Sequence, residues 1–283
     1  MQNFDEQLKT LVVNALREDI GDGDHSTLSC IQPDARGKAI LKIKEHGILA
    51  GVDVAEKIFR WHDVSAVFKK MMNDGDKMKN GDVAFEVEGN VQAILMLERL
   101  VLNIMQRMSG IATLTRKYVE HLEGYKTKIL DTRKTTPNFR LLEKEAVRIG
   151  GGHNHRMGLY DMIMLKDNHI DYAGGLENAI NKAHEYVSAK KRDLKIEVET
   201  RNLEEVKRAL NTEKVDRIML DNFTPELLKE AVMLVDGRVE TEASGGINFE
   251  TIRSFAESGV DYISVGALIH QAKSLDLSLK AEK

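Results

Sequence analysis

Residues 194–221, LKIEVETRNLEEVKRALNTEKVDRIMLD, hold the pattern that decides the fold class. A run of strand length, Leu194–Val198, is followed by apolar residues at helical spacing, and a second such run, Arg217–Leu220, comes next. Buried strands that alternate with helices are typical of a parallel sheet with both faces covered. The stretch therefore predicts a β-α-β unit.

The same alternation runs through the second half of the chain. Six runs of strand length each precede a helical stretch; they are Thr127–Leu130, Met162–Leu165, Leu194–Val198, Arg217–Leu220, Val239–Ala243 and Tyr262–Val265. Six units are too few for a complete eight-stranded α/β barrel, and no Gly-x-Gly-x-x-Gly follows the first strand as in a dinucleotide-binding sheet. The sequence predicts an α/β fold with an incomplete barrel of about six strands.

The first part of the chain has a different pattern. Apolar residues at helical spacing predict a helix over residues 4–19, ended by Gly21. Residues 38–50 and 83–87 alternate apolar and polar residues and predict half-buried antiparallel strands. We expect Asn90 to cap a long helix over 91–109 that closes with a glycine, Gly110, and joins two domains.

Composition excludes several classes of protein. The chain has 283 residues, of which 42% are apolar and 30% charged, so it is neither disordered nor collagen-like. Its net charge is −4, so we expect no nucleic-acid partner. No apolar run approaches the ~20 residues of a membrane span, and the first residues lack a hydrophobic signal region. The single cysteine, Cys30, excludes an intramolecular disulfide. We expect a cytoplasmic protein without a membrane partner.

A polar residue or a glycine follows each of the six predicted strands. These residues are Asp131, Lys166, Glu199, Asp221, Ser244 with Gly245 and Gly246, and Gly266. The carboxyl ends of parallel barrel strands open on one face, so we expect these residues to converge on one mouth. The alternative is that charged residues simply end strands where the chain enters solvent.

Five potential cations lie in the densest part of the sequence, namely Arg133, Lys134, His155, Arg156 and Lys166. Arginine can hold a carboxylate or a phosphate through two parallel hydrogen bonds, and lysine supplies a point charge. The mixture predicts a polycarboxylate or a phosphorylated sugar as ligand, with a solvated basic loop as the alternative. The glycines after the last two strands favour a phosphate site, because backbone N–H groups and a helix N-terminus bind phosphate. The triplet Gly150–Gly152, taken alone, favours a helix C-terminus.

Glu199 and Asp221 end adjacent strands in the middle of the predicted sheet. Paired carboxylates there could bind Mg²⁺, hold ribose hydroxyls or stabilise a developing positive charge. Glycosidase chemistry is a further possibility, although the cations argue against a neutral sugar. His155 and His169 lack the spacing of a zinc site, and we expect a structural role for His169.

Together these motifs resemble the quinolinate phosphoribosyltransferase family, the carboxylating nicotinate-nucleotide pyrophosphorylases. The resemblance is carried by residues 131–137, 150–156, 158–161 and 166–170, with shorter matches at 21–24, 98–99, 109–113 and 264–268. It covers nearly the whole chain. One departure is Asn138-Phe139 where the family pattern has Gly-Leu, which leaves the conformation of that turn open.

The resemblance implies an N-terminal α/β sandwich, an incomplete α/β barrel, and a homodimer in which one N-terminal domain covers the partner's barrel mouth. We expect three segments: a sandwich domain with the interdomain helix over 1–112, the barrel over 113–270, and a C-terminal extension over 271–283 that packs on the sandwich. The resemblance also implies transfer of phosphoribose from phosphoribosyl pyrophosphate to quinolinate with Mg²⁺. The products would be nicotinate mononucleotide, pyrophosphate and CO₂, in de novo NAD biosynthesis.

The family's functional residues map onto matching positions of this chain. The dicarboxylate would be held by Arg99 (contributed by the partner subunit), Arg133, Lys134, His155, Arg156 and Lys166. The ribose and the Mg²⁺-bound pyrophosphate would face Glu199 and Asp221, which would reach the metal through water or pyrophosphate. The 5′-phosphate would lie on Ser244, Gly245, Gly246, Gly266 and His270. The catalytic set would be Lys134, Lys166, Glu199 and Asp221, with Glu197 as the alternative to Glu199 on the same strand face.

Two other functions fit part of the sequence. Lys166 closes an apolar run, 162–165, as a Schiff-base lysine does in barrel aldolases, and borohydride trapping would detect such chemistry. A non-catalytic binder with this barrel, similar to the pyrophosphorylase-like proteins associated with molybdate transport, is the second alternative. The presence of Lys166–His169 together with all the cations favours the phosphoribosyltransferase.

Overall fold

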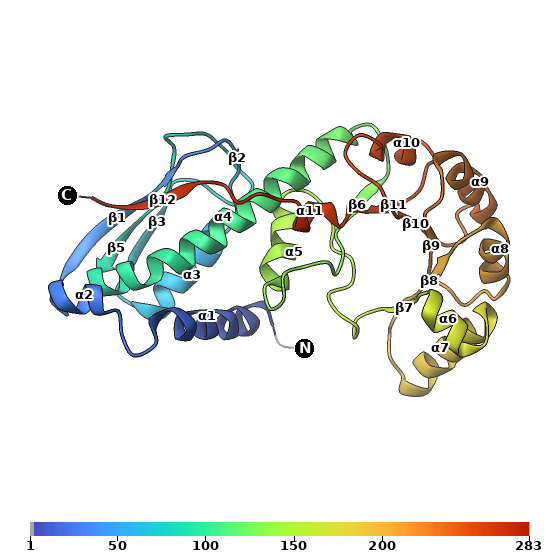
Figure 1. Cartoon of the computed structure of the whole chain (residues 1–283), viewed down its shortest axis with the longest axis horizontal. Coiled ribbons are helices and arrows are strands. Elements are labelled where there is room, and N and C mark those ends of the chain that lie inside the picture. Colours follow the sequence, from blue (N-terminus) through green and yellow to red (C-terminus); the bar gives the residue numbers. More distant parts are fainter. Residues whose placement is uncertain (1–2, 283) are drawn as a thin grey trace. The chain divides into compact units, whose positions relative to one another are not determined.

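The computed structural model describes residues 3–282, which form two compact units that interleave along the chain (Figure 1). Of the described residues, 3–116, 135–151 and 268–282 form the first unit, and 117–134 and 152–267 form the second. The division into segments at 112 and 270 stays a prediction. Within residues 3–282, no helix has both the length and the apolar character required to cross a membrane.

The first unit is built on a four-stranded antiparallel sheet. Its strands, in spatial order, are β12 (Leu277–Glu282), β1 (Arg36–Ile43), β5 (Val83–Asn90) and β3 (Val67–Lys70). A smaller sheet pairs β2 (Gly47–Ile48) with β4 (Lys77–Met78). The strands predicted within 38–50 and over 83–87 are confirmed. Pairing of β12 with β1 makes the last strand of the chain an edge of the N-terminal sheet.

Helices complete the first unit, namely α1 (Phe4–Ile20), α2 (His25–Cys30), α3 (Val52–His62), most of α4 (Val91–His121) and α5 (Arg140–Ile149). The predicted N-terminal helix is confirmed, because α1 starts at a capping box between Asn3 and Glu6 and stops at Gly21, whose φ is +58°. The unexpected Asn138 has a φ of +62°. Asparagine tolerates this left-handed conformation better than most residues other than glycine, so the residue suits the turn.

The start of α4 was predicted correctly and its end was not. The side chain of Asn90 accepts a hydrogen bond from the backbone N–H of Ala93 at 2.9 Å, as an N-cap does. The predicted end at Ser109 is wrong, since α4 continues to His121. A Cβ atom on Gly110 would overlap the carbonyl oxygen of Lys273. The glycine therefore permits another backbone to approach the helix and does not end it.

The second unit contains a six-stranded parallel sheet. Its strands are β6 (Lys128–Leu130), β7 (Ile163–Leu165), β8 (Ile196–Thr200), β9 (Arg217–Asp221), β10 (Glu240–Ser244) and β11 (Tyr262–Ser264). The spatial order is β6-β11-β10-β9-β8-β7, so the first strand of the sequence pairs with the last. The two edge strands, β6 and β7, are not hydrogen-bonded to each other, and the barrel is open between them. All six predicted strands and the incomplete barrel are confirmed.

Helices lie outside this curved sheet (Figure 1). They are α6 (Asp167–Ala173), α7 (Leu176–Lys190), α8 (Leu203–Asn211), α9 (Pro225–Val235) and α10 (Ile252–Ala256), and the short α11 (Ala267–His270) follows the last strand. Side chains of Asn202 and Thr224 cap α8 and α9. These local signals explain why each helix starts directly after a strand-end loop.

The segment 153–156 lies beside β6 on the open side of the barrel. His153 forms an isolated parallel bridge with Leu130, and its backbone N–H donates to the carbonyl of Ile129 at 2.8 Å. The buried carboxylate of Asp131 accepts from the backbone N–H of His155 at 2.9 Å and from the Asn154 side chain at 2.6 Å. The segment thus occupies the position of a further strand.

Candidate active site

The polar strand-end residues meet at one edge of the parallel sheet. Lys166 follows β7 directly, Glu199 lies near the end of β8, and Asp221 is the last residue of β9. Ser244 ends β10 and pairs in register with Asp221, while Gly266 follows β11. The arrangement follows from the parallel topology, in which all strand carboxyl ends point the same way.

Lys166, Glu199 and Asp221 form one electrostatic group at this mouth. The Lys166 Nζ lies 2.7 Å from a carboxylate oxygen of Glu199. Burial raises the pKa of Asp221, and the charge of Glu199 adds to the effect while Lys166 opposes it. A Schiff-base lysine is activated by desolvation in an apolar pocket or by a second cation, whereas the Lys166 side chain is 45% exposed and contacts a carboxylate. The ion pair therefore argues against the aldolase interpretation.

A second group at the mouth is cationic. Burial lowers the pKa of Arg156, and the positive charge of Arg133 lowers it further, so the two guanidinium groups interact. The Arg156 Nη1 donates to the carbonyl of Met162 at 3.2 Å. Lys134 has an exposed side chain, and its backbone N–H donates to the Thr132 hydroxyl at 3.0 Å. Like charges kept near one another favour an anionic ligand between them.

The turn after β10 has the backbone shape that requires glycine. Gly245 has a φ of +98°, and a Cβ atom there would overlap the side chain of Asn222. Gly246 has a φ of +65° with open space where its Cβ would be. Two successive glycines with positive φ expose backbone N–H groups, which suits close approach of a phosphate.

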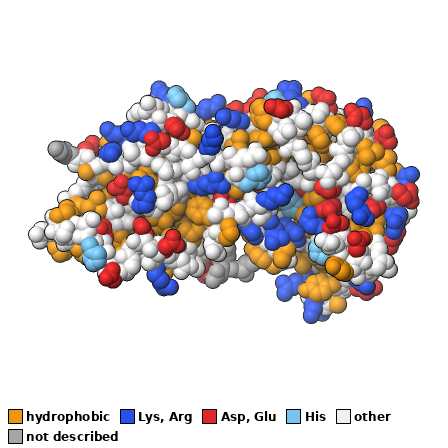
Figure 2. All heavy atoms as spheres, in the orientation of Figure 1, with side chains coloured by type: hydrophobic (Ala, Val, Ile, Leu, Met, Phe, Trp, Pro, Cys, Tyr) orange, Lys and Arg blue, Asp and Glu red, His pale blue; other side chains and the backbone are white. Residues whose placement is uncertain are grey.

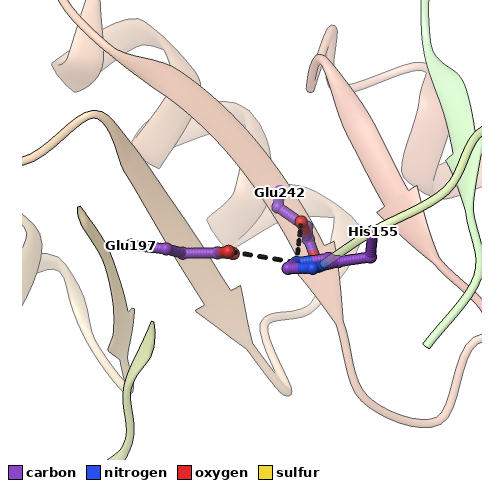
Figure 3. Close-up of side chains that lie close together, drawn as sticks. All are labelled: His155, Glu197 and Glu242. Atoms are coloured by element: carbon purple, nitrogen blue, oxygen red, sulfur yellow. Dashed lines mark ion pairs between the residues drawn. The ribbon is translucent and has the colours of Figure 1, made fainter. Parts of the chain in front are cut away.

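His155 does not lie with the exposed cations but points into the barrel. Its Nε2 is 3.0 Å from Glu197 of β8 and 3.2 Å from Glu242 of β10, and Figure 3 shows the three side chains converging. Its Nδ1 accepts a hydrogen bond from the backbone N–H of Arg156 at 2.6 Å. The structure therefore separates Glu197, which is buried in the barrel, from Glu199, which reaches Lys166.

The cluster of His155, Glu197 and Glu242 holds a proton above neutral pH. Burial lowers the pKa of His155, but the two carboxylates outweigh burial and raise the pKa to about 9. Burial and the charge of Glu242 raise the pKa of Glu197. Since the Arg156 N–H uses the lone pair of Nδ1, the protons lie on the side of Nε2 and the carboxylates. Arg217, whose Nη1 is 3.1 Å from Glu242, compensates the remaining negative charge.

Two groups of side chains could hold a metal ion by their chemistry. Within residues 3–282, the one group of three His, Cys, Asp or Glu side chains with suitable spacing is His155, Glu197 and Glu242, whose ligand atoms lie within 4.8 Å of one another. Its charges balance without a metal ion, because the proton held by the cluster and the guanidinium of Arg217 oppose the carboxylates. The second group is formed by the buried Glu199 and the half-buried Asp221 at the strand ends, and carboxylate oxygens are the ligands that Mg²⁺ prefers.

Two residues predicted for the site belong to the first unit, and one residue of the second unit was missed. Arg99, on an exposed face of α4, and His270, at the end of α11, belong to the first unit. His169 is structural as expected, since its Nδ1 accepts the Lys166 backbone N–H at 3.0 Å. The sequence analysis missed Glu242. Its signal was a glutamate inside a predicted buried strand, two residues before Ser244 and so on the same strand face.

Positive charge on the surface is concentrated locally and does not cover the molecule. Figure 2 shows charges of both signs over the face that it presents, with one area in which Lys and Arg side chains predominate. The net charge of the chain is −4. Attraction of an anionic ligand must therefore come from local clusters such as Arg133 with Arg156.

The fold and the mouth define an α/β-barrel enzyme for ligands with several anionic oxygens. The chain belongs to the quinolinate phosphoribosyltransferase family. The family's N-terminal domain, described as "Quinolinate phosphoribosyl transferase, N-terminal domain", matches residues 24–109, and its C-terminal domain matches residues 111–280.

Several known proteins are similar to the chain over nearly its whole length. The carboxylating, chloroplastic nicotinate-nucleotide pyrophosphorylase of Arabidopsis thaliana is 46% identical, over 97% of this chain and 83% of that protein. A probable carboxylating nicotinate-nucleotide pyrophosphorylase of Bacillus subtilis (strain 168) is 43% identical, over 96% and 93%. The solved structure of the nicotinate-nucleotide pyrophosphorylase from Francisella tularensis has a TM-score of 0.90 at 40% identity, covering 100% of this chain and 98% of that one.

Proposed function

We propose that the chain transfers the phosphoribosyl group of phosphoribosyl pyrophosphate to quinolinate in de novo NAD biosynthesis. The C1′–pyrophosphate bond breaks, the bond from C1′ to the pyridine nitrogen forms, and the 2-carboxylate leaves as CO₂. The electron pair of the lost carboxylate stays on the ring and takes up a proton, which gives nicotinate mononucleotide. The proposal rests on the mouth of the barrel, where a cationic group adjoins the Lys166–Glu199–Asp221 group.

Quinolinate binds to the cationic side of the mouth. Arg133 and Arg156 bind carboxylate oxygens, and Lys134 and Lys166 add point charges, because two carboxylates on one ring need several cations. His155 borders this half through its hydrogen bond with Arg156. Arg99 completes the half from the partner subunit of a homodimer.

Phosphoribosyl pyrophosphate binds to the remaining strand ends. Ser244, Gly245, Gly246 and Gly266 hold its 5′-phosphate through backbone and hydroxyl groups, and His270 adds a further contact. Glu199 and Asp221 face the ribose. They would also hold Mg²⁺, which prefers carboxylate oxygens, through water or pyrophosphate. An ion held there would supply positive charge to the leaving pyrophosphate.

The residues at the mouth suit a reaction without a protein nucleophile. Ribose that carries pyrophosphate at C1′ reacts through an oxocarbenium-like centre. The protein therefore positions two polyanions and stabilises the positive charge that develops at C1′. The carboxylates of Glu199 and Asp221 lie where positive charge develops at C1′. Once the ring nitrogen is alkylated, its positive charge accepts the electrons released with CO₂. A general-base triad is not required.

Formation of nicotinate mononucleotide from quinolinate tests the proposal. The chain should use quinolinate with Mg²⁺ and should not use nicotinate, which lacks the 2-carboxylate. Lys166→Ala should lower kcat/KM by about a hundredfold or more. The exposed lysine Lys207 of α8 gives a matched control, and Lys207→Ala should retain activity. Equal turnover of nicotinate and quinolinate would contradict the proposal.

The homodimer and the compartment are tested separately. Mixing the Arg99→Ala and Lys166→Ala variants should restore part of the activity, since each mixed dimer would contain one intact site. No recovery after verified subunit exchange would contradict a shared site. The cytoplasmic location stays a prediction.

A further inference from the structure

The charged cluster inside the barrel has no role in the proposed chemistry. Barrel interiors are commonly filled by branched apolar side chains. Here Glu197 and Glu242 are both 0% exposed and contact the ring of His155 from β8 and β10. Burying two carboxylates costs free energy, and apolar side chains of similar volume often stabilise a core as well or better. Stability alone therefore does not explain the cluster.

The two glutamates cannot touch a ligand at the mouth, because neither has any exposed surface. Their contacts lead to the mouth through His155. The Nε2 of this ring faces the carboxylates, and its Nδ1 accepts the backbone N–H of Arg156 at 2.6 Å. The guanidinium of Arg156 also donates to the carbonyl of Met162 at 3.2 Å. Arg156 is thus held at its backbone and at its side chain.

Contacts at both ring nitrogens fix the orientation of the His155 ring. A histidine ring turned by half a turn would present a carbon in place of Nδ1, and the Arg156 N–H would lose its acceptor. Two carboxylates on the Nε2 side oppose that rotation, since it would remove the ring N–H from both of them. The backbone N–H of His155 donates to Asp131, which fixes the start of the same segment. The orientation of the ring therefore depends on Glu197 and Glu242.

We propose that Glu197 and Glu242 are positioning residues, which hold the His155 ring so that Arg156 is oriented toward the carboxylates of quinolinate. This inference rests on the proposed function, because it assigns Arg156 to the quinolinate half of the site. It predicts that a change at Glu197 acts on quinolinate and acts only through Arg156. A structural role would instead affect both substrates.

A double-mutant cycle with calorimetric titration of quinolinate tests the inference. Glu197→Gln keeps the shape of the side chain and removes its charge. It should raise the Kd for quinolinate about five- to tenfold, the loss expected when one hydrogen bond from Arg156 to the ligand is weakened. In the Arg156→Ala background the same change should alter the Kd less than twofold. The Kd for phosphoribosyl pyrophosphate should stay within twofold in both backgrounds.

The matched control is Glu240→Gln. Glu240 contacts Arg217 at 3.0 Å, as Glu242 does at 3.1 Å, but no contact links it to His155. The control should leave the Kd for quinolinate unchanged. If Glu197→Gln does not fold, as judged by circular dichroism, Glu197→Asp replaces it, because the shorter side chain withdraws the carboxylate from the ring.

Three results would overturn the inference. They are an unchanged Kd for quinolinate in the Glu197 variant, an equal effect with and without Arg156, and an equal loss of affinity for both substrates. Failure of the proposed function is a different result, because the unaltered protein itself would then not bind quinolinate.

Discussion

The antiparallel sheet of the first unit and the parallel sheet of the second bury two different groups of side chains. In the first unit Phe59, Phe68 and Phe85 pack with ring centroids 4.5–6.1 Å apart, on α3 and the antiparallel sheet. In the second unit the barrel interior contains the ion-paired cluster of His155 and two glutamates. The aromatic group excludes water by apolar burial, whereas the charged cluster lies among buried apolar side chains and holds charges in fixed positions.

Apolar contacts and buried ion pairs contribute different properties to a folded unit. Apolar contacts are non-directional and insensitive to pH, so they stabilise a unit without fixing the orientation of one particular side chain. Ion pairs in a buried site are directional, and they are costly when one partner is lost. A buried ion cluster therefore belongs where the orientation of a side chain matters, directly behind the binding mouth.

The largest expected effect is in the apolar core. Phe85 is fully buried, so Phe85→Ala should lower the free energy of unfolding by about 3–5 kcal/mol. The only tryptophan, Trp61, lies in α3, so its fluorescence during denaturant unfolding reports on this unit. Phe85→Leu, which keeps most of the volume, should cost less than about 1.5 kcal/mol. Equal losses for the two variants would contradict a closely packed core.

The next effect should come from the charged core. Glu242→Gln removes the charge that faces both His155 and Arg217, and should lower the free energy of unfolding by about 3 kcal/mol. Glu240→Gln removes a charge that faces the same Arg217 at a half-exposed position, and should cost less than about 1 kcal/mol. Denaturant unfolding followed by far-ultraviolet circular dichroism measures both. A larger loss for Glu240→Gln would reverse the assignment of the core.

The pH dependence should separate the two cores. The pKa of His155 is raised to about 9 in the folded chain, against about 6.5 in an unfolded one. The proton that His155 shares with the two carboxylates stabilises the fold fully below pH 6.5, and this contribution of about 3 kcal/mol is lost as the pH rises through 9. His155→Gln should flatten this part of the stability curve. The loss caused by Phe85→Ala should be the same at pH 6 and pH 9, and a pH-dependent loss there would contradict the comparison.

The smallest effect should come from an exposed ion pair. Glu177 of α7 and Arg208 of α8 form two contacts of 2.6 Å, and this pairing lowers the pKa of Glu177 to about 2. Both side chains are more than 40% exposed, so Glu177→Gln should cost about 0.5 kcal/mol or less. Thermal unfolding in 1 M salt should show no such loss, because the Debye length is then about 3 Å and the charges of the pair are screened. Glu185→Gln, an exposed change on the same helix, is the control.

Local signals explain which parts of the fold were predictable. The six barrel strands and α1 follow from periodicity and caps, which act over a few neighbouring residues. Gly110 misled the prediction of α4, because a glycine that ends a helix and a glycine that admits another backbone look alike in sequence. The departure from the family pattern at Asn138 left the conformation of that turn undecided. The φ of +62° shows that asparagine fits the turn.

The sequence by itself determined the incomplete barrel, its six strands and the set of charged residues at the strand ends, because parallel topology brings all strand ends to one edge. Tertiary structure alone decided which charges face solvent and which are buried. Glu197 and Glu199 share a strand face, and only the depth of each in the barrel separates a partner of His155 from a partner of Lys166. His155, in the sequence one more cation beside Arg156, turns inward because β8, β10 and the 153–156 segment meet there. Such a meeting of distant segments leaves no signal in local sequence.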